Sequence, residues 1–418
     1  MTDSRHGELV CDVAISGGGM VGCALGCALA QQGLRVALIE QKEPQRDWPA
    51  EEVDLRVSAL SRASQVMLEN LGVWEAMGRM RVSPYRRMQV WDAVGKGSIE
   101  FDASEIGEPD LGHIVENRVT RLALWDRLGE FDNLVSLCPD RVVQISLEQD
   151  GARLELMSGR NLRAGLLVGA EGALSPVRDM AGITSSGWDY DQHAIVATVW
   201  PEFNHESVAR QRFMPAGPLA LLPIDDGRCS IVWSTSPDEA DRLMGLDDER
   251  FLQELTAASE NVLGQITRTG PRGVFPLRLR NADRYVKAGL ALVGDAAHGV
   301  HPLAGQGVNL GFMDAAVLAD VIAEAGRAGR SLGSLGTLRR YERARKGATI
   351  GMLGTMDMFK RLFSNRNLPL IKLRNLGLGL VDNSGPLKYT IIRRAMGMAG
   401  ERPTLARRIP WQPGDGGL

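Results

Sequence analysis

The sequence predicts a mixed α/β fold built on a parallel sheet, and two stretches far apart in the chain carry that prediction. Near the start, an apolar run at Cys11–Ser16 indicates a buried strand, a helical pattern follows at Ala24–Gln32, and Arg35–Ile39 has the pattern of a second strand. Far downstream, a short apolar strand at Leu290–Val293 leads through a glycine-rich loop to a helix that starts near Val308. Strands and helices that alternate in this way are typical of a parallel sheet covered by helices.

The loop between the first strand and the first helix has the spacing of a nucleotide-binding turn. It is Gly17-Gly-Gly-Met-Val-Gly22, in which Gly17, Gly19 and Gly22 permit a tight turn and the close approach of a pyrophosphate to the helix N-terminus. Glu40 closes the second strand, where an acidic side chain can accept hydrogen bonds from ribose hydroxyls. The unit therefore predicts a Rossmann-type dinucleotide-binding domain. It does not separate FAD from NAD, and no second copy follows a strand elsewhere in the chain.

The downstream stretch can hold a polar, partly anionic ligand. Gly294 and Asp295 follow the strand, Pro302 and Gly305 punctuate the loop, and the helix begins near Val308. A helix start offers free N–H groups and partial positive charge. The alternative is a sharp turn between strand and helix in which Asp295 is structural. The nucleotide motif at the other end of the chain favours the ligand-binding interpretation.

Arg56 follows the nucleotide-binding unit closely in sequence. Its planar guanidinium can reach the pyrophosphate of a bound nucleotide. The alternative is a surface ion pair with Glu51 or Asp54. Ser61, five residues later, has the residue type of an N-cap and predicts a helix around residues 65–70.

The middle of the chain changes to the alternation of half-exposed strands. The pattern occurs at Arg87–Trp91, Ser98–Phe101, His193–Trp200, Val208–Phe213, Leu219–Ile224 and Cys229–Ser234. Several aromatic side chains in this part either wall a pocket for an apolar ring or belong to the core. They are Trp188, Trp200, Phe213 and Trp233.

From residue 275 the chain returns to the nucleotide-binding domain, so that domain is predicted to be discontinuous, with an antiparallel-sheet substrate domain inserted into it. A helical C-terminal region follows. The predicted boundaries are 1–82, 111–185 and 275–338 for the nucleotide-binding domain, 83–110 and 186–274 for the sheet-rich domain, and 339–418 for the C-terminal region.

Composition and charge exclude several classes of protein. The N-terminus is polar without a signal-peptide core, and no run of eighteen apolar residues occurs, so we expect a cytoplasmic protein without a membrane span. Five cysteines without a CxxC pair fit free thiols in a reducing compartment. Six histidines without the spacing of a metal motif predict no metal site, and we expect no nucleic-acid partner.

Charge is distributed unevenly along the chain. Residues 339–418 hold sixteen Lys and Arg against five Asp and Glu, a net charge of +11, whereas the whole chain carries −3. This basic region favours an anionic partner, such as a phospholipid surface with which the protein associates peripherally. The alternative is an ordinary solvated helical face.

Three signatures in order resemble the single-component FAD-dependent aromatic hydroxylases. They are the Gly17 to Gly22 turn with Glu40, then Gly169-Ala-Glu-Gly-Ala-x-Ser-x-Val-Arg178, then Gly294-Asp-Ala-Ala-His298 with Pro302 and Gly305-Gln-Gly-Val-Asn309. The ubiquinone-biosynthesis branch is similar over nearly the whole chain, through Asp54-x-Arg56, Leu111-Gly-His-Ile-Val-Glu-Asn117, Trp188-Asp-Tyr190, Ser230-Ile-Val-Trp-Ser234 and His301-Pro-Leu-Ala-Gly-Gln-Gly-Val-Asn-Leu-Gly311. Within this branch, the segments 188–198 and 230–240 most resemble the 2-polyprenylphenol 6-hydroxylases.

The resemblance implies a fold, a reaction and a substrate. The fold is a glutathione-reductase-like FAD-binding domain of the aromatic-hydroxylase type. NAD(P)H, a transient co-substrate, reduces FAD, and O2 then forms a flavin 4a-hydroperoxide that hydroxylates the ring of a polyprenylated phenol or quinol in ubiquinone biosynthesis. Alternatives are a hydroxylase for another ring position, an epoxidase or prenyl reductase on this scaffold, and a catalytically silent flavin-binding subunit. Proteins of the biosynthetic complex and a second copy of the chain are the partners left open.

The resemblance also implies roles for individual residues. Glu40 binds the adenosine ribose, Arg56 and Asn117 lie along the pyrophosphate, and Asp295 binds the ribityl chain. The backbone N–H groups of Gly307, Val308 and Asn309 face the flavin ring, where a helix start stabilises the anionic reduced form. Glu171 stands where the family has Asp, in a loop that contacts FAD and the nicotinamide. His298 and His301 flank the flavin loop, either as proton relays or, as we favour, through hydrogen bonds within the loop.

Overall fold

A computed structural model describes residues 8–95, 97–299, 307–364, 382 and 384–408, without the side chains of Trp188, Tyr190 and residues 352–364. Within these residues, none of the helices combines the length and the apolar composition that a bilayer crossing requires. His301 and Pro302, to which the sequence assigned a place beside the ligand, lie outside the described residues.

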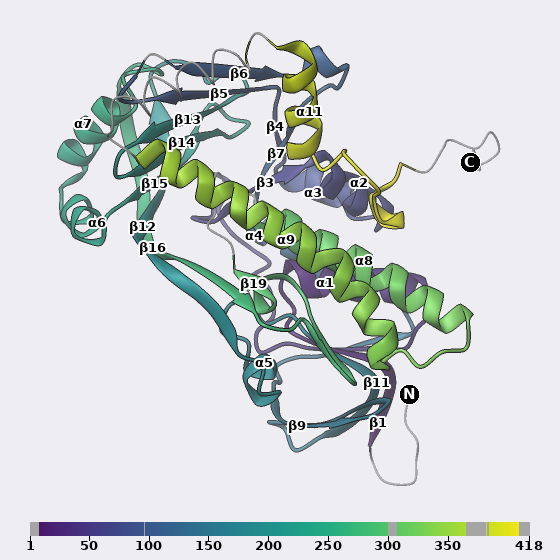
Figure 1. Ribbon diagram of the computed structural model, residues 1–418. Helices are drawn as coiled ribbons and strands as arrows, with labels where there is room; N and C mark the ends of the chain where they lie inside the picture. The colour runs from purple at the N-terminus through teal and green to yellow at the C-terminus, as the bar shows by residue number, and fades with distance from the viewer. Residues whose placement is uncertain (1–7, 96, 300–306, 365–381, 383, 409–418) are drawn as a thin grey trace, which may run out of the picture.

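A largely parallel sheet forms the lower part of the molecule in Figure 1. Its order is β17-β18-β11-β1-β2-β8, and the hairpin β9–β10 continues it antiparallel from β11. The strands are β1 (Leu9–Ser16), β2 (Val36–Ile39), β8 (Leu134–Leu137), β9 (Val142–Glu148), β10 (Gly151–Leu156), β11 (Asn161–Gly169), β17 (Val286–Lys287) and β18 (Leu290–Leu292). Strands β1 and β18 are both parallel neighbours of β11, so the two sequence stretches that predicted the fold end at the same edge of one sheet.

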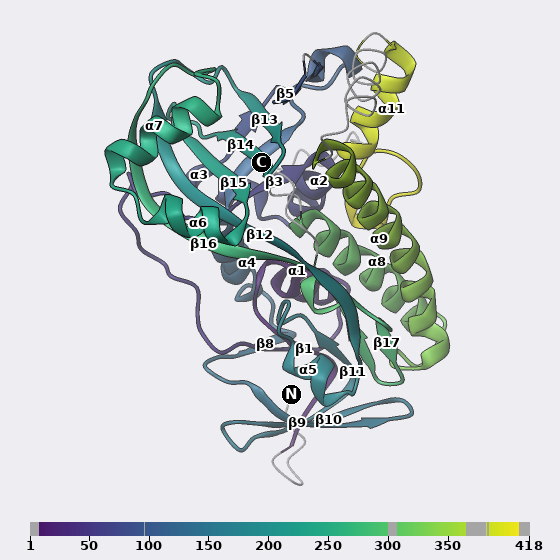
Figure 2. The same ribbon diagram turned by 60° about the vertical axis from the view of Figure 1, so that its left-hand side comes forward.

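Helices bury the main core against this sheet. They are α1 (Met20–Gln31), α4 (Asn117–Leu128), α5 (Pro176–Met180), α8 (Gly307–Arg327) and α9 (Leu335–Ser364), with the short turn η2 (Gly294–Ala296) between β18 and α8. Helix α1 is buried almost all round, because small residues such as Cys23 and Cys27 let α4 and α8 approach it closely. Helices α8 and α9 lie side by side in both views (Figures 1 and 2).

A second, mixed sheet forms the upper part, in the order β19-β16-β12-β15-β14-β13-β5-β6. Its strands are β5 (Arg87–Asp92), β6 (Ser98–Asp102), β12 (Ser185–Pro201), β13 (Val208–Met214), β14 (Gly217–Pro223), β15 (Cys229–Thr235), β16 (Ile266–Ala282) and β19 (His298–Gly299). Helices α6 (Pro237–Met244) and α7 (Asp248–Ala258) cover one of its faces. The β13–β5 pair is parallel and the other pairs are antiparallel.

A small sheet, β3-β7-β4, lies between the two larger ones. Its strands are β3 (Val57–Ser61), β4 (Ser83–Tyr85) and β7 (Gly112–Glu116), and the elements around it are α2 (Arg62–Asn70), α3 (Trp74–Met80), η1 (Ala103–Ile106), α11 (Gly385–Ala395) and η4 (Thr404–Ala406). The Ser61 side chain accepts a hydrogen bond from the Ser64 N–H, which confirms the predicted N-cap of α2.

The mixed α/β fold is confirmed, and the predicted strands and helices of the described residues form where the periodicity placed them, with shifts of a few residues at their ends. The predicted domain boundaries stay predictions. Strands β12 and β16 have 17 residues each and run from the upper sheet down beside the parallel sheet (Figure 1), so a long stretch of backbone hydrogen bonds connects the two parts.

His113 of β7 gives the fold a pH dependence. The side chain is buried against the edge of Trp74, and burial, reinforced by the Arg62 guanidinium, lowers the pKa of His113 to about 4. The unfolded chain then binds more protons between pH 6.5 and pH 4, so stability falls as the pH falls through this window, by at most about 3 kcal/mol. We expect His113→Gln to flatten the dependence of the urea midpoint on pH in this range. An unchanged slope in the variant would assign the effect to other groups.

Candidate functional site

A cavity of about 770 Å³ opens between the carboxyl ends of the parallel strands and the upper sheet. Nine of the residues that the sequence predicted for the site line it. They are Gly17, Gly19, Glu40, Arg56, Asn117, Glu171, Asp295, Gly307 and Val308. The other two residues predicted to bind the cofactor, Gly22 and Asn309, are not part of the lining, although each neighbours a residue that is. The sequence therefore predicted the place of the cavity from two stretches nearly 280 residues apart.

Gly17, Gly19 and Gly22, the three glycines of the motif between β1 and α1, differ in what makes a side chain unfavourable at each position. Gly17 has φ +108° and a Cβ there would stand 2.5 Å from the Ala170 carbonyl oxygen. A Cβ on Gly22 would stand 1.9 Å from the Gly17 carbonyl oxygen, so this glycine allows the helix to start directly against the turn. A Cβ on Gly19 would meet no protein atom within 4 Å, because it would project into the cavity. Protein contacts thus require glycine at positions 17 and 22, whereas no protein contact of a Cβ requires it at position 19.

Glu40 at the end of β2 is held by the turn it faces. Its carboxylate accepts a hydrogen bond from the Gly18 N–H at 2.5 Å and one from the Lys42 N–H at 3.1 Å. Arg121 of α4, which the sequence did not single out, lies 3.6 Å from the same carboxylate and donates to the Gly18 carbonyl oxygen at 2.9 Å. Arg121 also lines the cavity, one helical turn after Asn117. This i, i+4 spacing was the signal that could have found it.

Arg56 and Asn117 meet where β3 and α4 come together. The Ser58 hydroxyl donates to the Asn117 side-chain oxygen at 2.7 Å, and the Asn117 N–H donates to the Arg56 carbonyl oxygen at 2.9 Å. The Arg56 guanidinium is exposed at the cavity and stacks 5.8 Å from the centre of the Phe275 ring. In the described part of the chain no ion pair joins it to a nearby acidic residue, so the cationic head faces the cavity.

Asp295 projects into the cavity from the turn after β18. Its side chain is open to the cavity but enclosed by protein on the other sides, and this burial raises the pKa of Asp295 because desolvation disfavours the charged form. The first turn of α8 borders the same space through Gly307, Val308 and Gly311. A helix of 21 residues therefore starts against the cavity, where its free N–H groups favour an anionic ligand.

Asn309 anchors this first turn by its side chain. Its amide nitrogen donates to the Ala59 carbonyl oxygen at 2.8 Å, and its oxygen accepts from the Ser61 N–H at 3.0 Å and from the Ser64 hydroxyl at 2.7 Å. The sequence assigned only a backbone role to Asn309. Its side chain in addition fixes the start of α8 to β3 and α2.

Glu171 follows β11 and leaves one oxygen unmatched. One carboxylate oxygen accepts from the Ser175 hydroxyl at 2.6 Å, and the other, Oε1, is buried without a hydrogen-bond partner among the described residues. Burial raises the pKa of Glu171. An unmatched buried oxygen costs free energy, so Glu171 is held at some cost to the stability of the loop.

His298 does not face the cavity. It is 1% exposed, and its Nε2 lies 2.5 Å from a carboxylate oxygen of Asp314, which is buried in α8. The Asp314 carboxylate raises the pKa of His298 against the opposing effect of burial. The hydrogen bond of this histidine goes to α8 and not to another residue of the loop, and its role as a proton relay stays an untested alternative.

The wall of the cavity opposite the nucleotide loop is apolar and comes from the upper sheet. Its apolar side chains are Ala194, Val196, Val232, Phe275, Pro276 and Leu277, and Ser230, Arg278 and Arg280 line the cavity from the same sheet. The sequence had offered other aromatic residues for such a wall, and the described ones do not line it. Trp233 packs on the opposite face against Phe251, with ring centres 6.3 Å apart, and Phe213 packs with Val90. Trp200 stacks with the guanidinium of Arg268.

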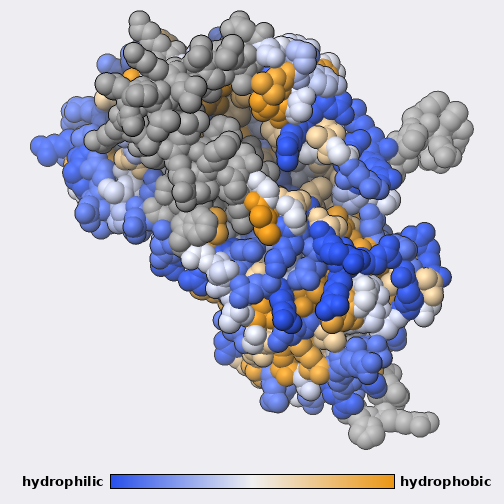
Figure 3. Space-filling view, viewed as in Figure 1, coloured by the Kyte–Doolittle hydropathy of each residue, from blue (hydrophilic) through white to orange (hydrophobic). Residues whose placement is uncertain are grey.

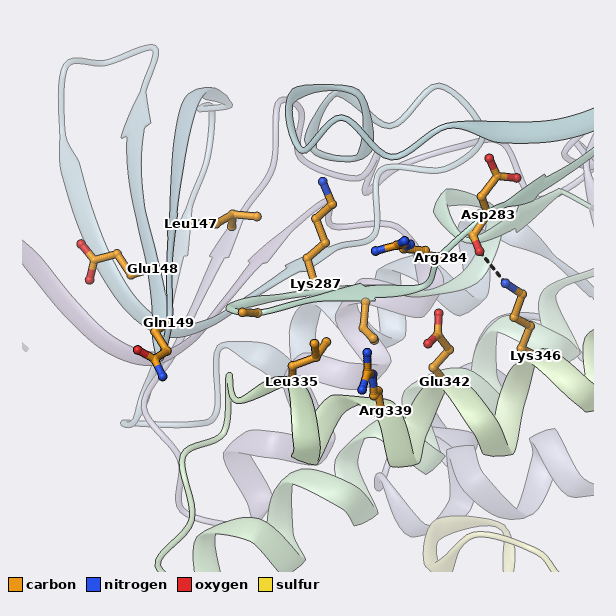
Figure 4. Close-up of a pocket in the computed structure, with 12 residues that line it drawn as sticks. Leu147, Glu148, Gln149, Asp283, Arg284, Lys287, Leu335, Arg339, Glu342 and Lys346 are labelled. Atoms are coloured by element: carbon orange, nitrogen blue, oxygen red, sulfur yellow. Dashed lines mark hydrogen bonds between the residues drawn. The ribbon is translucent and has the colours of Figure 1, made fainter.

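A second cavity of about 700 Å³ lies between β17, α9 and the β9–β10 turn (Figure 4). It contains none of the predicted site residues. Several of its charged side chains are already bound to the backbone: Lys287 and Lys346 each donate to a carbonyl oxygen at 2.5 Å, and Glu342 accepts from a backbone N–H at 2.8 Å. The first cavity is therefore the candidate site.

Comparison with known proteins identifies what this site holds. A family model described as an FAD binding domain matches residues 10–349. The 3-demethoxyubiquinol 3-hydroxylase of Escherichia coli K12 is 41% identical over 387 residues, which cover 93% of this chain and 98% of that protein. The chain belongs to the FAD-dependent hydroxylases of ubiquinone biosynthesis. This confirms the family that the sequence motifs resembled.

Two further comparisons extend over nearly all of the hydroxylase. The mitochondrial ubiquinone biosynthesis monooxygenase COQ6 of Xenopus tropicalis is 37% identical over 438 residues, covering 93% of the hydroxylase and 94% of the relative. The crystal structure of p-nitrophenol 4-monooxygenase from Pseudomonas putida DLL-E4 has a TM-score of 0.76 at 19% identity and covers 94% of the hydroxylase and 100% of that chain. The structural likeness shows the fold.

The residues that line the cavity have the chemical properties that FAD binding requires. Gly19 leaves room where a side chain would project into the cavity, as the close approach of a pyrophosphate requires. The α1 and α8 N-termini both border the space with N–H groups, which suit the negative charge of a pyrophosphate and of a reduced flavin. The hydroxylase is an FAD-dependent aromatic monooxygenase.

Proposed function

We propose that the hydroxylase adds one hydroxyl group to the aromatic ring of a polyprenylated phenol or quinol, with NAD(P)H and O2 as co-substrates. The observation that carries this proposal is the shape of the cavity. It extends from the glycine turn and Glu40, past Asp295 and Val308, to an apolar wall of the upper sheet at Val232. A dinucleotide with a redox-active ring fits along the polar part, and an apolar substrate ring fits against the wall.

The residues along the cavity have a proposed order of contacts with FAD. Glu40 accepts from the adenosine ribose, Arg56 and Asn117 lie along the pyrophosphate, and Asp295 binds the ribityl chain. The N–H groups at the start of α8 face the pyrimidine edge of the flavin, where a helix start stabilises negative charge.

Bound FAD supplies the redox chemistry, in which NAD(P)H, a proton, O2 and the ring give NAD(P)+, water and the hydroxylated ring. The chain supplies orientation and a dry environment. Side chains such as Ala194, Val196 and Val232 exclude water from the ring position and offer no group that competes with the substrate for the oxidant. The geometry calls for no acid–base triad of side chains.

The prenyl tail has a proposed path beneath α11. Val57 and Val232, which line the cavity, also pack against an apolar cluster that includes Leu222, Ile392 of α11 and Met396 directly after that helix. The cluster leads away from the ring position toward the C-terminal region, which carries the net charge of +11. A tail that follows the cluster leaves the protein beside a basic surface that suits an anionic phospholipid membrane.

Vesicle binding tests this membrane contact. Helix α11 exposes Leu387 and Ile391, 47% and 37%, and hydrophobic atoms gather over it in Figure 3. We expect Leu387→Glu combined with Ile391→Glu to reduce co-sedimentation with phosphatidylglycerol vesicles at least fivefold, because each change adds a negative charge and removes apolar contact.

Val143→Glu, at an exposed valine of β9 far from α11, is the matched control and should sediment like the wild type. The side chains of Arg361, Arg366 and Arg374 lie outside the described residues. Because the sequence predicts a basic C-terminal region, removal of these three charges is a second test of vesicle binding. Equal sedimentation of all variants would reject membrane docking by this region.

The function itself is tested by the compound that accumulates without the protein. Mass spectrometry of quinone intermediates in deletion cells should show a prenylated ring that lacks one hydroxyl, and its structure gives the ring carbon. The sequence resembled the 2-polyprenylphenol 6-hydroxylases, whereas the similar Escherichia coli enzyme is a 3-hydroxylase, so attack at carbon 6 stays a prediction. An intermediate altered in its prenyl chain with an intact ring pattern would instead indicate an epoxidase or a reductase.

A further inference from the structure

A buried ionic network connects three segments of the chain behind the cavity. Asp314 of α8 is fully buried, and its Oδ1 accepts from the Arg345 guanidinium at 2.6 Å. Its Oδ2 lies 2.5 Å from His298 Nε2 and accepts from the Gly294 N–H at 3.0 Å. Arg345 comes from α9 and also donates to the Leu310 carbonyl oxygen at 3.2 Å.

The network holds both ends of the loop that presents Asp295. Gly294 is the residue before Asp295 and has φ +59°, and His298 closes the loop at β19. Asp314 binds these two residues with one carboxylate oxygen, so the position of Asp295 depends on Asp314. Arg345 holds the carboxylate from the other side.

The same network fixes the first turn of α8. Leu310, whose carbonyl oxygen accepts from Arg345, lies in the turn that borders the cavity at Val308 and Gly311. A Cβ on Gly311 would stand 3.2 Å from the Gly294 Cα, so the helix start packs directly on the loop. Both groups that face the flavin region, the Asp295 side chain and the α8 N–H groups, are therefore braced from α9.

Stability alone is a weak reason for such an arrangement. A buried ion pair loses about as much hydration as it gains in attraction, and apolar residues of the same volume often stabilise a core better. The contacts above give the network a different role. We propose that Asp314 and Arg345 are positioning residues that set the affinity for FAD and its reduction potential by fixing Asp295 and the start of α8.

The charges of the two residues predict that their substitutions shift the reduction potential of the flavin in opposite directions. Asp314→Asn removes a negative charge and leaves the Arg345 cation unpaired, which favours the anionic reduced flavin and raises the reduction potential. Arg345→Gln leaves the Asp314 carboxylate without its cation and lowers the potential. Both variants weaken FAD binding at least tenfold, because both release the loop.

The experiment measures the FAD dissociation constant by titration of the apoprotein and the midpoint potential of the reconstituted protein. Arg345→Lys should restore most of both values, since it keeps the charge. Arg340→Gln is the matched control, because Arg340 lies on the same helix and pairs with Glu324 at 2.7 Å on the surface. It should leave both values at those of the wild type.

Two outcomes would overturn the proposal. One is FAD binding within twofold of the wild type in Arg345→Gln, and the other is a potential shift of the same sign in Asp314→Asn and Arg345→Gln. If Asp314→Asn does not fold, the comparison of Arg345→Gln with Arg345→Lys still decides, since rescue by lysine is required. None of these measurements uses the aromatic substrate, so the result is independent of the proposed ring chemistry.

Discussion

Gly19→Ser is expected to leave the apoprotein as stable as the wild type while weakening FAD binding at least tenfold. Gly19 is the N-cap of α1 with an extended backbone, φ −76° and ψ −179°, which serine adopts readily and which serine favours at a helix start. Its new Cβ meets no protein atom within 4 Å, and the side chain occupies the space in which the pyrophosphate approaches the turn. Fluorescence titration with FAD and the thermal midpoint of the apoprotein measure the two effects separately.

Gly22→Ala is the counterpart, and its effect should fall on folding. The new Cβ would stand 1.9 Å from the Gly17 carbonyl oxygen and 3.3 Å from the Ala170 Cβ, so the backbone itself must move. We expect a loss of about 3 kcal/mol of stability, as for an overpacked core. If Gly19→Ser instead lost as much stability as Gly22→Ala, or bound FAD normally, the cavity would not be the pyrophosphate site.

The second large effect is expected for Val232→Trp. Val232 lies on β15 and lines the cavity, so a larger ring has open space to enter on that side. It then occupies the proposed place of the substrate ring. We expect FAD to stay bound, ring hydroxylation to fall at least 100-fold, and NAD(P)H to be oxidised with H2O2 as the product of O2.

The measurements are the yield of hydroxylated product per NAD(P)H and the amount of peroxide. Val143→Trp, an exposed strand valine outside the cavity, is the control and should behave as the wild type. Normal hydroxylation in Val232→Trp would place the substrate elsewhere and reject the apolar wall as its site.

What could be predicted from the sequence depended on whether the signal was local. The glycine turn and the Ser61 cap follow from spacing within a few residues, and both form as expected. Glu40 lies at the predicted end of β2, and its contact with a ribose stays a prediction. The meeting of the two distant stretches could be predicted as well, because parallel strands end at one edge of a sheet. Arg121 was missed although its spacing from Asn117 was informative.

The rest depends on contacts that no spacing encodes. The sequence left open whether the aromatic side chains of the upper sheet wall a pocket or belong to the core. Strand side chains alternate between faces: Val232 faces the cavity, so its neighbour Trp233 faces α7. A periodic pattern gives two faces without saying which one the ligand meets. Asp314 and Arg345 are 31 positions apart in the sequence and lie on different helices. Only the packing of α8 against α9 brings their charges together.

Strand β16 has a consequence for how the substrate range of such an enzyme can change. It supplies Phe275 and Leu277 to the wall, and further along it pairs with β19, so that Asn281 lies opposite His298. Inserting one residue between these sites would turn the wall side chains to the other face or pull the loop away from its anchor. Strand β15 also supplies side chains to the wall, but its neighbours are β12 and β14, so it has no direct pairing with the loop that carries His298. We therefore expect natural drift and laboratory selection for new substrates to accumulate substitutions in β15, while β16 tolerates neither insertion nor deletion.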